Sequence, residues 1–200
     1  MNSNLSVLRK SANQIKEVNL CAAELEKNII WISGNITEDL ANDFIRKMMA
    51  INMNPTNSKP IKVFITTNGG SVDAGLVIYD TIQSSKLPVY TIAIEKAYSM
   101  GAIILAAGEK RFIFPHSKVM IHQPIVHSGL VGNIDDLNSI TEHLLKTNDK
   151  LIHILAEHTN KTLEEIQEAT KYDHYFTADE AIEFGLVDKQ IGFNEMMNEL

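Results

Sequence analysis

Three side chains in this chain of 200 residues have the types that a serine hydrolase needs, namely Ser99, His122 and Asp173. A serine hydroxyl is a poor nucleophile until a base removes its proton, and the imidazole that does so needs a third group to fix its tautomer. Taken alone, each residue has a more common structural role: a helix N-cap, a packed core histidine and a solvated loop carboxylate. The three therefore predict nucleophilic catalysis only if the fold brings them together.

A pair of glycines, Gly69 and Gly70, lies between an apolar run and a predicted helix. Glycine adopts positive φ and lets the backbone approach a ligand, so these N–H groups are candidates for an oxyanion hole or for holding an extended peptide. Taken alone, such a pair is most often just a turn. The surrounding residues 66–71 match neither a Walker loop nor a G-x-G-x-x-G motif, so phosphate binding is not supported.

The elements that must position these residues follow an alternating pattern. Short apolar runs alternate with helical patterns, which is typical of an α/β fold with mostly parallel strands. Ser99 follows the third run and His122 ends the fifth, which would let them meet from neighbouring elements. The predicted strands are 29–32, 61–65, 89–94, 111–114 and 119–121, and the predicted helices between them are 37–51, 71–83 and 100–107.

The C-terminal part of the chain is mostly helical. One long amphipathic helix is predicted over 133–158, and it is too long to be explained by ordinary packing alone. Capping boxes beginning at Thr162 and Thr177 predict two further helices, and Gly185 is placed as a helix C-cap. The long helix carries leucines seven residues apart, at Leu137, Leu144 and Leu151.

Length and patterning predict one domain over residues 29–200, preceded by an N-terminal arm or helix of uncertain role over residues 1–28. The first segment is polar and weakly periodic. A chain of this length buries a single core without disulfides or metals.

Composition excludes several classes of partner. The 18 basic and 25 acidic residues give a net charge of −7, which argues against nucleic acid or an anionic membrane. A single cysteine, Cys21, cannot form an internal disulfide. The sequence shows neither a signal-peptide pattern nor an apolar run long enough to span a membrane. We therefore expect a cytoplasmic protein. The histidines are scattered without ligand spacing, so no metal or other cofactor is expected.

Several linked motifs closely resemble those of the ClpP family, the proteolytic subunits of the ATP-dependent Clp protease. The resemblance covers about residues 28–190, and the shared order of the motifs makes it specific although each motif alone is weak. The motifs are 69–83, 99–102, 105–108, 120–124, 155–159 and 178–188.

The resemblance implies a crotonase-like fold of repeated ββα units with a protruding handle helix, about 133–158. It implies seven-membered rings stacked face to face around a closed chamber. The implied activity is that of a serine endopeptidase that degrades unfolded polypeptides fed to it by an AAA+ ATPase unfoldase.

The resemblance also assigns roles to individual residues. Ser99 would be the nucleophile, His122 the general base and Asp173 the orienting acid. The backbone N–H groups of Gly70 and Met100 would form the oxyanion hole.

Four residues would bind substrate by the same resemblance: Gly69, Gln123, Pro124 and Ile125. The strand and loop after Pro124 would pair with an extended polypeptide through backbone hydrogen bonds. Such pairing is largely independent of sequence and suits a protease for unfolded proteins.

The chain departs from the family pattern near the predicted site. Residues 66–68 are Thr-Thr-Asn instead of Asn-Ser-Pro, and residues 95–98 are Glu-Lys-Ala-Tyr instead of Gly-x-Ala-Ala. We expect Tyr98 to narrow the pocket or alter its specificity. Residues 171–173 are Lys-Tyr-Asp instead of Asp-Arg-Asp, which keeps Asp173 but removes an arginine that helps to pair the rings.

The first 28 residues lack the family's axial-loop sequence. Two alternatives therefore stay open beside the active protease. One is a weakly active or regulatory ring subunit that works with an active paralogue in a mixed ring. The other is an acyl-CoA enzyme of crotonase fold, which also uses paired N–H groups to hold an oxyanion.

Overall fold

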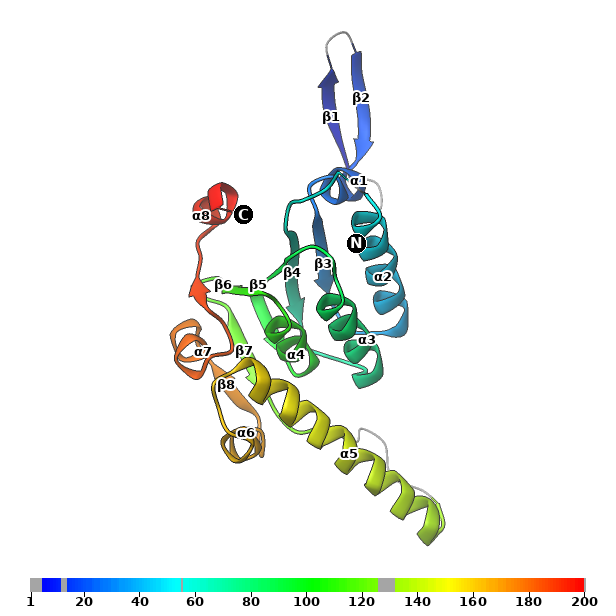
Figure 1. The fold of residues 1–200 in the computed structure, drawn as a ribbon, viewed down its shortest axis with the longest axis vertical. Coiled ribbons are helices and arrows are strands. Elements are labelled where there is room, and N and C mark those ends of the chain that lie inside the picture. The colour runs from blue at the N-terminus through cyan, green and yellow to red at the C-terminus, as the bar shows by residue number, and fades with distance from the viewer. Residues whose placement is uncertain (1–4, 12–13, 55, 126–131, 200) are drawn as a thin grey trace.

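The computed structural model describes residues 5–11, 14–54, 56–125 and 132–199, and a seven-stranded sheet forms its centre (Figure 1). Strands β3, β4, β5, β6 and β9 lie side by side in that order, and β7 pairs with both β5 and β8. Every pairing in this sheet is parallel except that of β7 with β8. The strands are β3 (Ile29–Ser33), β4 (Ile61–Thr67), β5 (Val89–Tyr98), β6 (Lys110–Ile113), β7 (Lys118–Ile121), β8 (His174–Phe176) and β9 (Lys189–Gln190).

Strand β5 changes its partner halfway along its length. Its residues Tyr90–Ala93 pair with β6, and its residues Lys96–Tyr98 pair with β7. The register with β4 shifts between Ile65 and Thr67, which is the mark of a β-bulge. The bulge lets the carboxyl end of β5 leave β6 and continue beside β7, where the next residue is Ser99.

Apolar side chains fill both faces of the sheet. Helices α2 (Glu38–Asn52), α3 (Val72–Gln83) and α4 (Met100–Ala106) supply the main core on one face, and all seven residues of α4 are buried. A smaller cluster includes Phe64 and Ile92, which are paired neighbours in the sheet, and Met196 of α8 (Phe193–Glu199). Because β4 is buried on both faces, its sequence is an almost continuous apolar run.

The long helix α5 (Ile134–His158) projects away from the domain (Figure 1). It begins with a capping box between Asn133 and Asp136, and its buried residues, Leu151, Ile152, Ile154 and Leu155, all lie near its C-terminal end. At the other end Ile134 is 77% exposed. The predicted architecture, a parallel α/β sheet with a long protruding helix, is confirmed.

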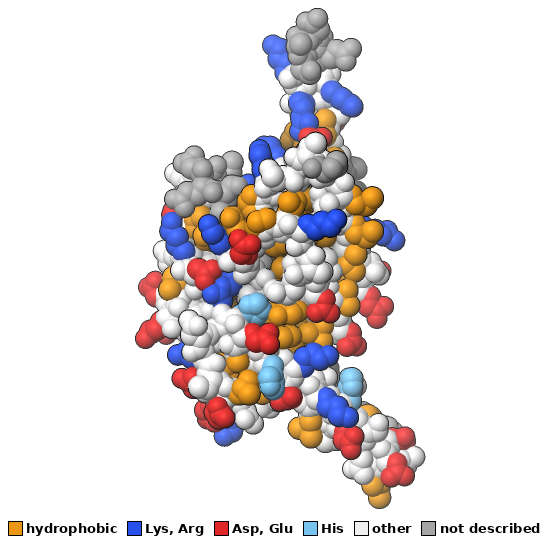
Figure 2. Space-filling model, viewed as in Figure 1, with side chains coloured by type: hydrophobic (Ala, Val, Ile, Leu, Met, Phe, Trp, Pro, Cys, Tyr) orange, Lys and Arg blue, Asp and Glu red, His pale blue; other side chains and the backbone are white. Residues whose placement is uncertain are grey.

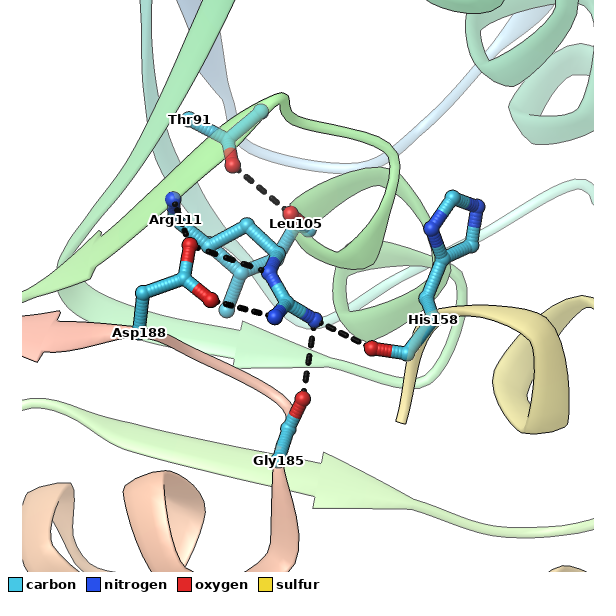
Figure 3. Close-up of polar contacts among 6 residues, drawn as sticks. All are labelled: Thr91, Leu105, Arg111, His158, Gly185 and Asp188. Atoms are coloured by element: carbon cyan, nitrogen blue, oxygen red, sulfur yellow. Dashed lines mark hydrogen bonds and ion pairs between the residues drawn. The ribbon is translucent and has the colours of Figure 1, made fainter. Parts of the chain in front are cut away.

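Arg111 of β6 ties the end of α5 to the sheet (Figure 3). Its guanidinium donates to the carbonyl oxygen of His158, the last residue of α5, at 2.5 Å, and to that of Gly185 at 2.8 Å. Gly185 is the C-cap of α7 (Ala178–Phe184), as predicted. The same guanidinium forms an ion pair with Asp188. A cation is favourable at helix C-termini because the last carbonyls carry partial negative charge.

His158 gives the folded state a dependence on pH. Its Nε2 lies 2.9 Å from the Tyr79 hydroxyl oxygen. Burial, and then the charge of Arg111, lower the pKa of His158 from its usual 6.5, although Glu157 acts in the opposite direction. The unfolded chain therefore binds this proton more readily than the folded chain. The contribution of His158 to stability is complete above about pH 6.5 and is lost as the pH falls through the lower folded pKa.

We expect the melting temperature to fall between about pH 7 and pH 5, because His158 must be protonated against its surroundings. Differential scanning calorimetry of the wild type and a His158→Gln variant across this range measures the effect. The variant should show a shallower fall than the wild type. An equal fall in both proteins would contradict the assignment to His158.

The first described residues form a hairpin of β1 (Ser6–Ser11) and β2 (Gln14–Asn19), followed by the short helix α1 (Leu20–Leu25). The hairpin projects from the end of the domain opposite to α5 (Figure 1). Figure 2 shows the basic side chains that it carries, and Leu8 on β1 is 76% exposed. The N-terminal segment thus combines a two-stranded arm with a helix, whereas the sequence left the choice between arm and helix open.

The remaining helix α6 (Leu163–Ala169) starts at the capping box of Thr162, and α7 starts at that of Thr177, as predicted. Throughout the described ranges, every helix is too short or too polar to cross a membrane.

Candidate active site

The ladder of β5, β7 and β8 brings three distant segments of the chain to one place. Tyr98 of β5 pairs with Met120 of β7, and Met120 pairs with Tyr175 of β8. Because β7 and β8 run antiparallel, two further steps along their ladder set His122 opposite Asp173. Ser99 follows Tyr98 directly. The strand register thus accounts for the proximity of all three predicted residues.

The side chains of the three residues are in hydrogen-bond contact. His122 Nε2 lies 2.8 Å from Ser99 Oγ, and His122 Nδ1 lies 3.0 Å from Asp173 Oδ1. When the ring carries its proton on Nδ1, that N–H donates to the carboxylate and Nε2 is free to accept the hydroxyl proton of Ser99. His122 is largely buried, whereas the Asp173 side chain is half exposed. This geometry would allow His122 to act as a base toward Ser99 while Asp173 orients the imidazole.

Ser99 has a strained backbone conformation. Its φ of 55° and ψ of −121° lie in a region that side-chain-bearing residues rarely adopt. It occupies the N-cap position of α4, yet its side chain makes no capping hydrogen bond. The N-cap alternative for Ser99 is therefore not realised, since the hydroxyl points to His122 instead.

The two glycines form a tight loop against Ile36 and Ser99. Gly69 has a φ of 99° and Gly70 a φ of 152°. A Cβ on Gly69 would lie 2.7 Å from Ser99 Cβ, and a Cβ on Gly70 would lie 2.3 Å from the carbonyl oxygen of Ile36. The Ile36 N–H donates to the Gly69 carbonyl, and the Ser71 N–H donates to the Ile36 carbonyl, each at 2.9 Å. Only glycine fits both positions.

The backbone N–H groups of Gly70 and Met100 are the predicted oxyanion donors. Met100 is the first residue of α4, where N–H groups have no partner within the helix. In the Gly70 loop the hydrogen bonds to Ile36 use the neighbouring Gly69 carbonyl and Ser71 N–H. Among the hydrogen bonds of the described residues, neither the Gly70 nor the Met100 N–H is a donor.

A small cavity of about 30 Å³ lies beside Ser99 and His122. Three helices supply its mostly apolar wall. The sequence did not indicate that residues of the long helix line this cavity, because helical periodicity shows only which side chains are buried. The residues that line the cavity are Val72, Ser99, Met100, Ile103, Ile121, His122, Pro124, Asn148, Leu151, Ile152, Leu155 and Thr170.

The predicted substrate-binding residues lie around the site in different ways. Pro124 lines the cavity, and Gly69 lies against Ser99. The Gln123 N–H donates to the Thr170 carbonyl at 2.9 Å, and Ile125 is 54% exposed. The loop predicted to continue from there, residues 126–131, lies outside the described residues.

Tyr98 is not among the described residues that line the cavity, and its effect on specificity stays a prediction. Its ring lies instead against the ring of Tyr175, with 5.5 Å between the centroids. Sequence reasoning missed Tyr175, because its only signal is its position two residues after Asp173.

A larger cavity lies elsewhere in the domain and includes Lys86, Glu109 and His158 in its lining. Ser99, His122 and Asp173 are not among the described residues that line it. Within the part of the chain that the structure describes, no group of three or more His, Cys, Asp or Glu side chains is placed to hold a metal ion.

A comparison with protein-family models gives a match to the family described as Clp protease, over residues 11–194. The match spans nearly the whole chain and includes every residue of the site.

Proposed function

This chain belongs to the Clp protease family, and on that basis we propose that it is a serine endopeptidase of the ClpP type. One observation carries the proposal: His122 contacts Ser99 Oγ through Nε2 at 2.8 Å and Asp173 through Nδ1 at 3.0 Å. A packed core histidine has no need for both partners.

The proposed reaction follows from these contacts. His122 Nε2 removes the hydroxyl proton while Ser99 Oγ attacks the peptide carbonyl, and Asp173 stabilises the imidazolium that forms. The N–H groups of Gly70 and Met100 donate to the oxyanion of the tetrahedral intermediate. His122 then gives its proton to the leaving amine, and a water molecule activated by the same imidazole releases the acyl group from Ser99.

The proposed substrate is an unfolded polypeptide in extended conformation. The residues proposed to bind this substrate are Gly69, which lies against Ser99, and Gln123, Pro124 and Ile125, which follow His122. Backbone hydrogen bonds to an added strand hold a peptide largely independently of its sequence. The apolar cavity beside Ser99 is small, about 30 Å³, and would accept only a small substrate side chain.

The proposed assembly is a pair of stacked heptameric rings. Helix α5 supports this assembly, because its projecting part exposes apolar side chains such as Ile134 and Leu145 that another copy can cover. A closed chamber requires delivery of substrate, so an AAA+ unfoldase is the proposed partner. A mixed ring with a paralogue is the alternative assembly.

The experiment that tests the function combines a fluorophosphonate probe with native mass spectrometry. We expect the wild-type assembly to gain one probe per subunit, at Ser99, and the Ser99→Ala variant to gain none. The intact mass reports the number of subunits in the same measurement. A correctly assembled wild type that stays unlabelled would contradict the proposed function, and labelling only after a paralogue is added would support the mixed ring.

A further inference from the structure

Two tyrosine rings meet beside the candidate triad. The rings of Tyr98 and Tyr175 lie at 86° to each other with centroids 5.5 Å apart, an edge-to-face contact. Both residues pair with Met120, one from each side, so all three side chains project from the same face of the sheet. Met120 between them is buried. The tyrosine pair therefore bridges the strand that precedes Ser99 and the strand that follows Asp173.

The hydroxyl group of Tyr175 reaches the carboxylate of Asp173. Tyr175 Oη lies 3.5 Å from Asp173 Oδ2, whereas His122 Nδ1 lies 3.0 Å from the other oxygen, Oδ1. The first distance is long for a hydrogen bond, but catalytic hydrogen bonds are often long before substrate binds. Within the described residues, these are the two groups that hydrogen-bond the carboxylate of Asp173.

Tyr175 keeps its proton in these surroundings. Partial desolvation, and then the charge of Asp173, raise the pKa of Tyr175 above its usual 10, although the residue is 52% exposed. The hydroxyl group therefore remains a donor at neutral pH. Because the Asp173 side chain is half exposed, a single contact with His122 leaves its plane free to turn, and a second donor on Oδ2 restricts that rotation.

We propose that Tyr175 is a positioning residue whose hydroxyl holds the Asp173 carboxylate in the plane that His122 requires, and that Tyr98 holds the ring of Tyr175. The inference rests on the proposed function, since it concerns the same triad. Tyr98, which departs from the family pattern next to Ser99, thereby has a role outside the substrate cavity.

The test is a Tyr175→Phe variant, which keeps the ring contact and removes only the hydroxyl. We expect kcat for a peptide substrate to fall about fivefold, the usual effect of one hydrogen bond, with KM unchanged. The rate of fluorophosphonate labelling at Ser99 should fall by the same factor. Tyr172→Phe is the matched control, because Tyr172 is 77% exposed and its hydroxyl should not affect either rate.

Two variants of Tyr98 test the second half of the proposal. Tyr98→Phe keeps the ring and should behave as the wild type, whereas Tyr98→Ala should lower kcat. In the double variant Tyr98→Ala/Tyr175→Phe, kcat should be no lower than in Tyr175→Phe, because Tyr98 acts only through the hydroxyl of Tyr175. Native mass spectrometry checks that all variants assemble alike.

Three outcomes overturn the inference. The first is a kcat of Tyr175→Phe equal to that of the wild type. The second is a change in KM as large as the change in kcat. The third is additive losses of kcat in the double variant. Failure of the proposed function is distinguishable, because the wild type itself would then remain unlabelled, and the inference would fall with it. If the wild type is labelled and Tyr175→Phe is labelled as fast, only the inference fails.

Discussion

The Ser99→Ala variant is expected to lose peptidase activity, with kcat/KM at least about 10⁴-fold below the wild type. Alanine lacks the Oγ atom that contacts His122 Nε2, so no hydroxyl group remains for His122 to activate. Hydrolysis of an unstructured fluorogenic peptide measures the loss.

Ser117→Ala is the control for this substitution. Ser117 Oγ is buried and, among the described residues, has no hydrogen-bond partner, so its removal should leave activity unchanged. Residual activity of Ser99→Ala within tenfold of the wild type would show that another group performs the attack.

The same position also has a predictable effect on stability. Alanine keeps the Cβ that is strained at a φ of 55°, whereas glycine relieves the strain. We therefore expect Ser99→Gly to be inactive but more stable than Ser99→Ala, by about 1 kcal/mol in the free energy of unfolding. Equal melting temperatures would mean that the backbone conformation of Ser99 carries no strain.

Replacing Gly70 with alanine is expected to cost about 2–4 kcal/mol of stability and most of the activity. The new Cβ would lie 2.3 Å from the Ile36 oxygen and 2.7 Å from the Ile36 nitrogen, and both are backbone atoms that cannot rotate away. The loop must therefore shift, and the N–H of residue 70 shifts with it. Chemical denaturation and peptide hydrolysis measure the two losses.

Gly34→Ala separates steric conflict from backbone conformation. Gly34 has a φ of 84°, but a Cβ there would meet nothing within 4 Å. Its substitution should cost only the conformational penalty of about 1–2 kcal/mol and leave kcat unchanged. If Gly70→Ala were as stable and as active as Gly34→Ala, the close approach of Gly70 to Ile36 would have no functional role.

The sequence predicted the elements whose patterns are long and one-sided. Strand β4 was recognisable from its apolar run, and α5 from its periodicity and length. Capping boxes gave the starts of α6 and α7, because a Thr followed three residues later by Glu satisfies two backbone donors locally.

Other features had no such local signal. Strands β8 and β9 contain three and two residues, too few to show alternation, and they form only because longer strands lie beside them. The same holds within the candidate site. The sequence indicated Ser99, His122 and Asp173 by their residue types. The conformation of Ser99 and the contact of Tyr175 with Asp173 depend on the pairing of distant strands, which the sequence does not show.

The antiparallel pairing of β7 with β8 also fixes when the site is completed during synthesis. Asp173 follows His122 by 51 residues, and α5 and α6 lie between them. A growing chain on the ribosome therefore carries Ser99 and His122 for some time without the carboxylate. Under the proposed function, the nascent subunit cannot cleave neighbouring nascent chains until translation has passed β8 and that strand has docked on β7.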